Sequence, residues 1–195
     1  MSSRGGKALP TLGFLTVVQH AQHGFFGGYL LLNADARPLE FHCTAPVKPN
    51  RAQEILYGPT LEPYLYGEQI GQTLIAKSQL APLAVYTDLP AVLAVRPHVG
   101  MPVILVLGDS PLAPNAEAPP AAATGANYRV DDAHGRAATL PAFQLGRNRV
   151  TAATGYDDDR RFASAELEPL VQHFDLAEPF ARIRGAIDEA QRNGR

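Results

Sequence analysis

The chain has 195 residues, 46% of them hydrophobic, and its 17 basic and 19 acidic residues give a net charge of −2. This composition supports a buried core and excludes a disordered coil. It also argues against a nucleic-acid partner, because neutralising many phosphates takes a concentration of basic side chains.

The lack of an apolar targeting segment and the single cysteine predict a soluble cytoplasmic protein without membrane contacts. Residues 1–11 contain no apolar run, so we expect a disordered N-terminus without a secretory signal or anchor. The longest apolar run, Val103–Leu107, is too short to span a bilayer. The single cysteine, Cys43, cannot form an internal disulfide, which favours a reducing compartment.

Three strands are predicted first, over Leu12–Val18, Gly27–Leu32 and Leu39–Thr44. The second and third are separated by Asn33–Pro38, which holds the Asn, Asp and Pro residues that turns favour. Short connections of this kind predict an antiparallel meander.

Two helices follow the meander. Asn50, with Gln53 three residues later, resembles a capping box and predicts a short helix over Asn50–Tyr57. Gly58 and Pro59 break that helix. Thr60 is the expected cap of a second helix that runs to about Gln79 with apolar residues at helical spacing.

Three further strands are predicted over Leu83–Thr87, Ala91–Val95 and Pro102–Leu107. Their connections are short, so we expect antiparallel neighbours. Residues 12–108 are therefore expected to form a two-layer α+β core domain, with one antiparallel sheet and the order strand-strand-strand-helix-strand-strand-strand. This order resembles that of longin, roadblock and profilin-like domains, which implies an adaptor or a small-ligand sensor and transfers no residue roles.

The C-terminal part of the chain begins with residues 109–127, an Ala/Pro-rich segment that we expect to be a linker. In residues 128–195 we expect a weak hairpin, formed by 128–132 and 137–145, and two amphipathic helices. The apolar residues with helical spacing are Leu167, Leu170, Val171 and Phe174, then Leu176, Phe180, Ile183 and Ile187.

The candidates for metal ligation are His20, His23, His42 and Cys43, and Cys43 is also the candidate for thiol chemistry. His42 and Cys43 are adjacent on a strand, so their side chains point to opposite faces and cannot easily share an ion. The alternative is that His20 and His23 are solvated loop residues. Cys43 alternates with Leu39 and Phe41, which predicts a buried and inert thiol. We therefore predict no metal, no cofactor and no catalytic residue.

A cluster around the second helix is the predicted interaction surface. Its tyrosines offer large amphipathic contact area, although rings that simply cover the sheet edge are an equal alternative. Two glycines one turn apart imply a close backbone approach, which a helix packed on its own sheet explains better than a subunit contact. The surface comprises Arg51, Tyr57, Tyr64, Tyr66, Gly67 and Gly71.

The acidic triplet Asp157, Asp158 and Asp159 is predicted to be the solvated start of a helix, since acidic residues there favour the helix dipole. The hypothesis for the whole chain is a non-catalytic protein-interaction or regulatory domain with a tethered amphipathic helical tail, able to bind a protein partner or to form a homo-oligomer. The alternatives are a small Cys/His-dependent enzyme and a small-ligand sensor with a pocket between helix and sheet.

Overall fold

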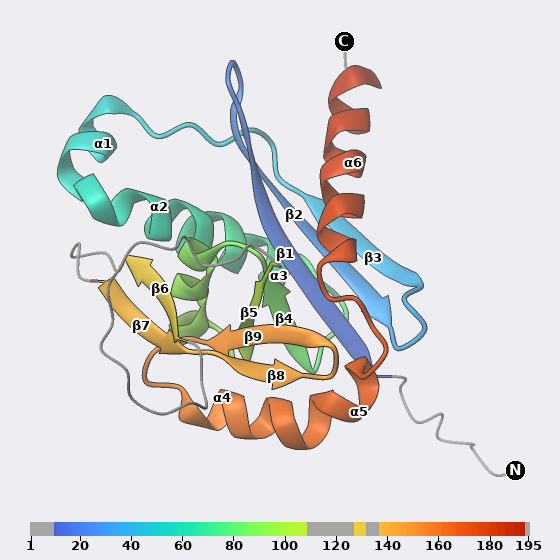
Figure 1. Cartoon of the computed structure of the whole chain (residues 1–195). Coiled ribbons are helices and arrows are strands. Elements are labelled where there is room, and N and C mark those ends of the chain that lie inside the picture. Colours follow the sequence, from blue (N-terminus) through green and yellow to red (C-terminus); the bar gives the residue numbers. More distant parts are fainter. Residues whose placement is uncertain (1–9, 109–126, 132–136, 194–195) are drawn as a thin grey trace, which may run out of the picture.

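A computed structural model describes residues 10–108, 127–131 and 137–193 (Figure 1). Seven strands form one mixed sheet in the order β3-β2-β1-β4-β5-β9-β8, and β6 and β7 form a separate pair. The strands are β1 Thr11–His20, β2 Gly24–Asn33, β3 Pro38–Cys43, β4 Ala84–Thr87, β5 Val103–Leu107, β6 Asn127–Asp131, β7 Ala137–Pro141, β8 Phe143–Leu145 and β9 Asn148–Ala152.

The N-terminal meander is confirmed: β1 pairs antiparallel with β2, and β2 pairs antiparallel with β3. The turn between β2 and β3 is held by the Asn33 side chain, which accepts hydrogen bonds from the backbone N–H groups of Asp35 and Arg37. The other turn of the meander, at His20–Gly24, is the tip of the β1–β2 hairpin, which projects beyond the neighbouring strands (Figure 1).

The predicted all-antiparallel sheet is wrong, because β4 runs parallel to β1 and β5 runs parallel to β4. The stretch Ala91–Val95 is not a strand but part of a 3₁₀ helix, η3 (Pro90–His98). Pro90 starts that helix with its fixed φ angle, after Leu89 in an extended conformation. Residues 88–102 thus supply the long crossover that parallel strands require, and the longin, roadblock or profilin-like analogy fails with the antiparallel sheet.

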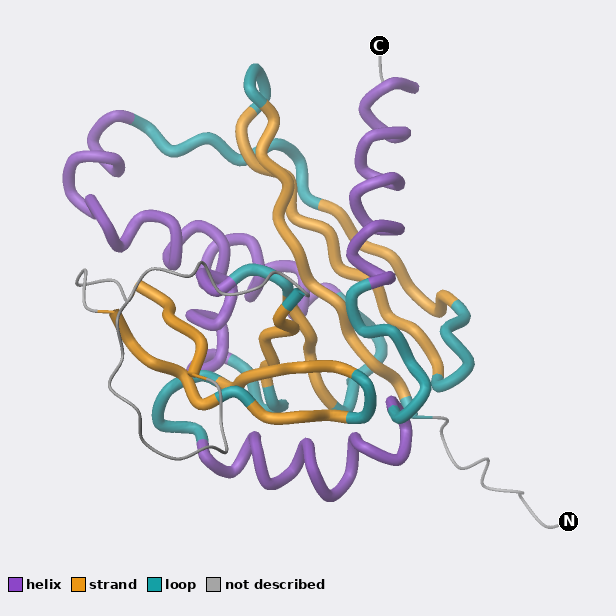
Figure 2. The backbone as a smooth tube through the Cα atoms, in the orientation of Figure 1, coloured by secondary structure: helices purple, strands orange, loops and turns teal. Residues whose placement is uncertain are grey.

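Helical segments cover both faces of the sheet, so the two-layer prediction is also wrong. One core cluster lies between the sheet and α4, η4, α5 and α6, and a second lies between the sheet and α2, η2, α3 and η3. Figure 2 shows these segments around the strands. The helical segments are α1 Arg51–Tyr57, η1 Gly58–Thr60, α2 Leu61–Pro63, η2 Tyr64–Gly71, α3 Gln72–Lys77, α4 Asp157–Phe162, η4 Ala163–Leu167, α5 Glu168–Val171 and α6 Glu178–Asn193.

The predicted helix starts differ in outcome. The capping box of Asn50 and Gln53 is present at α1 as predicted. Thr60, in contrast, makes no side-chain cap, because its hydroxyl donates to the Tyr57 carbonyl oxygen instead. The three segments α2, η2 and α3 continue one another from Leu61 to Lys77, which confirms the longer predicted helix.

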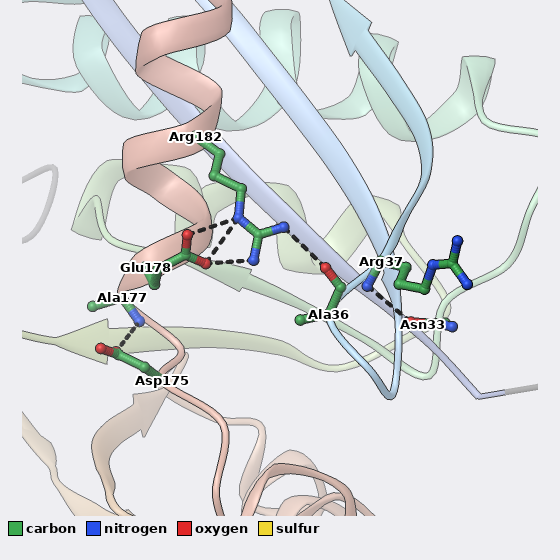
Figure 3. A network of polar contacts seen from close by, with 7 residues as sticks. All are labelled: Asn33, Ala36, Arg37, Asp175, Ala177, Glu178 and Arg182. Carbon is green, nitrogen blue, oxygen red and sulfur yellow. Dashed lines mark hydrogen bonds and ion pairs between the residues drawn. The ribbon is translucent and has the colours of Figure 1, made fainter.

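The C-terminal helix α6 is docked on the sheet and is not a tethered tail. Phe180, Ile183 and Ile187 are at most 2% exposed and belong to the core that α6 shares with β1 and β2. At the start of the helix, Arg182 binds the Glu178 carboxylate and donates to the Ala36 carbonyl oxygen at 2.9 Å, on the turn between β2 and β3 (Figure 3). The helix is therefore part of the folded core.

Of the hairpin predicted for 128–132 and 137–145, the pairing is present between β6 and β7, whereas residues 143–145 form β8 of the main sheet. The continuation of the chain adds two strands to the main sheet, since β9 pairs with β5 and with β8. The predicted disordered N-terminus and the predicted linker fall almost wholly outside the described residues. None of the described helices is long and apolar enough to cross a bilayer.

Candidate functional site

A groove of about 400 Å³ lies at the carboxyl end of β1, between the β1–β2 hairpin and the helical segment that begins at η1. The hairpin contributes Gln19 and Phe25, which face each other across the two strands. The helical side contributes Gly58, Pro59, Leu61, Glu62, Leu65 and Tyr66. The groove therefore joins residues about 40 positions apart in the chain.

Two aromatic rings meet in this groove. The rings of Phe25 and Tyr66 lie edge to face, with their centroids 5.5 Å apart and an interplanar angle of 60°. Leu65, only 1% exposed, anchors the same wall in the core. Tyr66 and Leu65 belong to one helical segment, η2, whose inner face is buried.

The polar side-chain groups of the groove are the Gln19 amide, the Glu62 carboxylate and the Tyr66 hydroxyl. Gln19 and Glu62 are both exposed. The pKa of the Tyr66 hydroxyl is raised to about 12, chiefly by burial and in smaller part by the negative charge of Glu62 and a hydrogen bond to it. Tyr66 is therefore a protonated donor beside Glu62 at any physiological pH.

The predicted interaction surface is divided by the structure. Tyr66 lines the groove, whereas the rings of Tyr57 and Tyr64 stack on each other with centroids 4.2 Å apart. Arg51 is 82% exposed at its side chain and pairs with Glu54. Gly58 and Leu65, which follow Tyr57 and Tyr64 in the chain, line the groove, so the stack of Tyr57 and Tyr64 lies next to the groove along the chain.

The two glycines of that predicted surface lie inside the molecule. A Cβ on Gly67 would stand 2.7 Å from both the Ala94 Cβ and the Val95 backbone nitrogen of η3. A Cβ on Gly71 would stand 3.1 Å from Leu15 of β1. The close approach is thus between η2, η3 and the sheet of the same chain.

A second cavity, of about 370 Å³, lies on the opposite face of the sheet, beside the last turns of α6. Cys43 lines it and is exposed, so the predicted burial of this thiol is wrong. The physical reason is that β3 is an edge strand, whereas α6 packs chiefly over β1 and β2. The apolar residues Leu39 and Phe41 of β3 are 45% and 40% exposed for the same reason.

The five histidines within the described residues lie in four places. His20 and His23 come together at the hairpin tip, and His42 binds Glu40 on the other face of β3. His98 ends η3, and His173 lies in the exposed turn after α5. Hydrogen bonding, chiefly to His42, lowers the pKa of the Glu40 carboxyl. Across the described ranges, no three His, Cys, Asp or Glu side chains gather where they could hold a metal ion.

The acidic triplet is only partly a solvated helix start. Asp157 and Asp158 are exposed, but Asp159 is 2% exposed and forms two hydrogen bonds with Arg96, at 2.6 and 2.8 Å. Arg96 also donates to the Val99 carbonyl oxygen and lies over the Tyr156 ring. This clamp ties α4 to η3 at the amino end of β5.

The groove residues Gln19, Phe25 and Glu62 were not singled out from the sequence. The sequence does contain one usable signal. Gln19 and Phe25 are equally far from the centre of the His20–Gly24 turn, so an antiparallel hairpin through this turn places them opposite each other. No local pattern, however, places Glu62 beside that pair.

No protein-family model matches the chain, and no curated protein sequence is similar to it. Solved structures with a comparable arrangement of elements include human endonuclease V (10% identity, 95% of this chain and 87% of that chain, TM-score 0.41). They also include the catalytic domain of the human enzyme (12% identity, 95% and 85%, TM-score 0.46). A third is endonuclease V of Ciona intestinalis with an inosine-containing 24mer DNA (12% identity, 75% and 72%, TM-score 0.39).

All three TM-scores are below 0.5, so no residue role is transferred from these structures. Two predictions are corrected here. The exclusion of nucleic acid rested on net charge alone, and one of these solved structures contains DNA. The hypothesis of a non-catalytic interaction domain with a tethered helical tail is corrected by the docked α6, which removes the tail on which that hypothesis depended.

Proposed function

We propose that this chain binds single-stranded nucleic acid by taking an unpaired base into the groove between the β1–β2 hairpin and η2. The observation that carries the proposal is the joint presence of two aromatic rings, one amide and one carboxylate in a groove of about 400 Å³. A flat heteroaromatic ring with hydrogen-bonding edges is the chemistry that this set fits best.

The position of the groove supports a binding role. In open sheets with parallel strands, ligands bind beside the carboxyl ends of those strands. Gln19 is the penultimate residue of β1, which runs parallel to β4. The volume of the groove also lies within the range of small-ligand sites, about 300–1,000 Å³.

The charges of the groove favour a base over a phosphate. Glu62 repels anions but accepts hydrogen bonds from the ring N–H and exocyclic amino groups of bases. Gln19 offers both a donor and an acceptor, so it can bind a base edge with two hydrogen bonds. Phe25 and Tyr66 offer apolar surface on which a base can stack, a contact that is tolerant of sequence.

The neighbouring tyrosine stack offers a second platform. Tyr57 and Tyr64 are partly exposed and stacked on each other. The Arg51 side chain pairs with Glu54 and remains largely exposed to solvent. A following base on Tyr57 or Tyr64, with its phosphate near Arg51, fits a strand that continues out of the groove. This assigns Arg51, Tyr57, Tyr64 and Tyr66 of the predicted surface to nucleic-acid binding.

A cytoplasmic location is part of the proposal. The one thiol, Cys43, is exposed and unpaired by any disulfide, which suits a reducing compartment. Single-stranded RNA is the nucleic acid that such a compartment supplies.

Fluorescence anisotropy with labelled single-stranded RNA and DNA, and with duplexes of the same sequence, tests this function. We expect single strands to bind more tightly than duplexes. Phe25→Leu should weaken binding about fivefold or more, because a stacked base contributes roughly 1–3 kcal/mol. Gln19→Ala and Glu62→Gln should weaken binding and change the preference among homopolymers.

A matched control stands outside the groove on the same helical segment. Gln69→Ala changes an exposed residue of η2 without touching the groove lining, so binding should stay unchanged. We also expect a shallow salt dependence, since few phosphates are neutralised. An absence of binding to all single strands, or equal losses in the groove and control variants, would refute the proposal.

A further inference from the structure

The tip of the β1–β2 hairpin brings two imidazoles together. His20 ends β1 and His23 lies three residues later, just before β2. Their Nδ1 atoms are 3.1 Å apart and their ring centroids are 4.5 Å apart. His20 Nδ1 also accepts a long hydrogen bond of 3.3 Å from the Gln22 backbone N–H. Both Nδ1 atoms therefore face one small volume: at this distance one Nδ1–H donates to the other Nδ1, and when both rings carry their proton on Nε2, both Nδ1 lone pairs are available to a cation.

The spacing of these nitrogens is close to that of two ligands on one metal ion. Metal–nitrogen bonds of about 2.0–2.1 Å at a tetrahedral angle place two ligand nitrogens roughly 3.3 Å apart. The two Nδ1 atoms need to separate by only a few tenths of an ångström from their present 3.1 Å. We propose that His20 and His23 chelate a borderline divalent cation, Zn²⁺ or Cu²⁺, at the hairpin tip.

The turn that carries the two rings is held in place by the neighbouring segment that contains Val47 and Lys48. Phe25 and Val47 exchange two backbone hydrogen bonds of 2.8 Å, and Lys48 Nζ donates to the Gln22 carbonyl oxygen at 2.6 Å. Gly24 has a φ of 96°, and a Cβ there would stand 2.4 Å from the Val47 carbonyl oxygen. The chelating geometry is thus prepared before any cation arrives.

The proposed site is open. Because the described residues supply no third His, Cys, Asp or Glu ligand, water fills the remaining coordination positions. His23 also lines the cavity that contains Cys43, so this thiol is the one soft ligand in the vicinity that needs separate testing. Imidazole prefers Zn²⁺ and Cu²⁺ over Mg²⁺ and Ca²⁺, so the hard cations should not compete.

Calorimetric titration of tag-free protein with ZnCl₂ tests the site, with Co²⁺ absorption as a spectroscopic readout. We expect one equivalent of Zn²⁺ to bind, and excess Mg²⁺ not to displace it. His20→Gln and His23→Gln should each weaken binding roughly tenfold or more, since the second ligand of a chelate acts at high effective concentration. Both side chains lie at the exposed tip, and circular dichroism checks that the variants fold.

The control variants are His98→Gln, which changes an exposed histidine of η3, and Cys43→Ser. Both should bind Zn²⁺ like the original chain. No binding by the original chain, or equal losses in His98→Gln and His20→Gln, would overturn the proposal. A loss in Cys43→Ser, with a thiolate-to-Co²⁺ charge-transfer band, would overturn the open two-histidine arrangement. None of these outcomes depends on nucleic-acid binding.

Discussion

The two ends of the parallel strands contrast in how they use polar side chains. At the amino end of β5, Arg96 and Asp159 are largely buried and saturate each other, and the backbone N–H of Val103 lies 3.4 Å from the same carboxylate. At the carboxyl end of β1, Gln19 and Glu62 are exposed at the rim of an aromatic groove. The first end joins helices to strands, and the second leaves its polar groups available to a ligand.

The contacts that stabilise the fold and the groove proposed for binding therefore lie at opposite ends of the parallel strands. The Arg96 clamp connects η3, α4 and β5, whereas the groove connects the hairpin to η1, α2 and η2. Substitutions at one end are therefore expected to leave the property of the other end nearly intact. Three predictions test this separation.

The largest effect is expected at the clamp. Arg96→Met leaves Asp159, which is 2% exposed, as an unpaired buried carboxylate. We expect the free energy of unfolding to fall by about 3–5 kcal/mol, as measured by urea denaturation. Arg161→Met, which breaks the exposed pair with Asp158, is the control and should change stability by less than about 1 kcal/mol.

Restoration distinguishes a buried charge from simple loss of packing. The double variant Arg96→Met with Asp159→Leu removes both charges and should recover a large part of the lost stability. Single-strand binding per folded molecule should remain unchanged in this double variant. A loss of binding greater than its loss of folded fraction would contradict the separation of the two ends.

An intermediate effect is expected at Gly67, where η2 meets η3. Gly67→Ala should destabilise the chain by about 1–3 kcal/mol, because the new Cβ would stand 2.7 Å from backbone and side-chain atoms of η3. Gly185→Ala in α6 is the matched control. A Cβ there meets nothing within 4 Å, so helix propensity should make it stabilising by up to about 1 kcal/mol. Thermal melts of both variants measure the difference.

The smallest effect concerns alkaline pH and sharpens the description of the groove. The folded-state pKa of Tyr66 is raised to about 12, from 10.0, chiefly by burial. The unfolded chain therefore loses its tyrosine protons first, so stability should fall as pH rises from 10 toward 12, by up to about 1.4 kcal/mol per pH unit for this residue. Burial also raises the pKa of Tyr29 and Tyr86.

Denaturation at several alkaline pH values, with tyrosinate absorbance as a second readout, measures that slope. Tyr66→Phe should reduce the slope, since one raised pKa is removed. An unchanged slope in Tyr66→Phe would show that the Tyr66 hydroxyl is not desolvated.

Local signals were sufficient for the N-terminal half of the sheet. The Asn33 turn and the Asn50 capping box depend on contacts between residues two to four apart, and both are formed as predicted. The apolar face of α6 was predicted for the same reason, because Phe180, Ile183 and Ile187 follow helical spacing. What these faces pack against is a tertiary property, and the tethered-tail prediction failed there.

Strand orientation failed because short apolar runs are ambiguous. Ala91–Val95 has the residues of a strand, and only Pro90 signals the helical start that makes the crossover possible. The uninterrupted burial of β5 is typical of a parallel strand covered on both faces, so its run of five apolar residues was an unused signal. The exposure of Cys43 and the burial of Asp159 depend on which strand lies at the edge and on a partner 63 residues away.

The most direct test of the proposed function is photo-cross-linking of the protein to a single strand that contains halogenated uracil, followed by peptide mapping. We expect adducts on Phe25 or Tyr66 at the groove, with weaker adducts on Tyr57 or Tyr64, and we expect these adducts to be lost on competition with unlabelled single strand. Adducts confined to other surfaces, or none at strand concentrations that saturate binding, would contradict the proposed function.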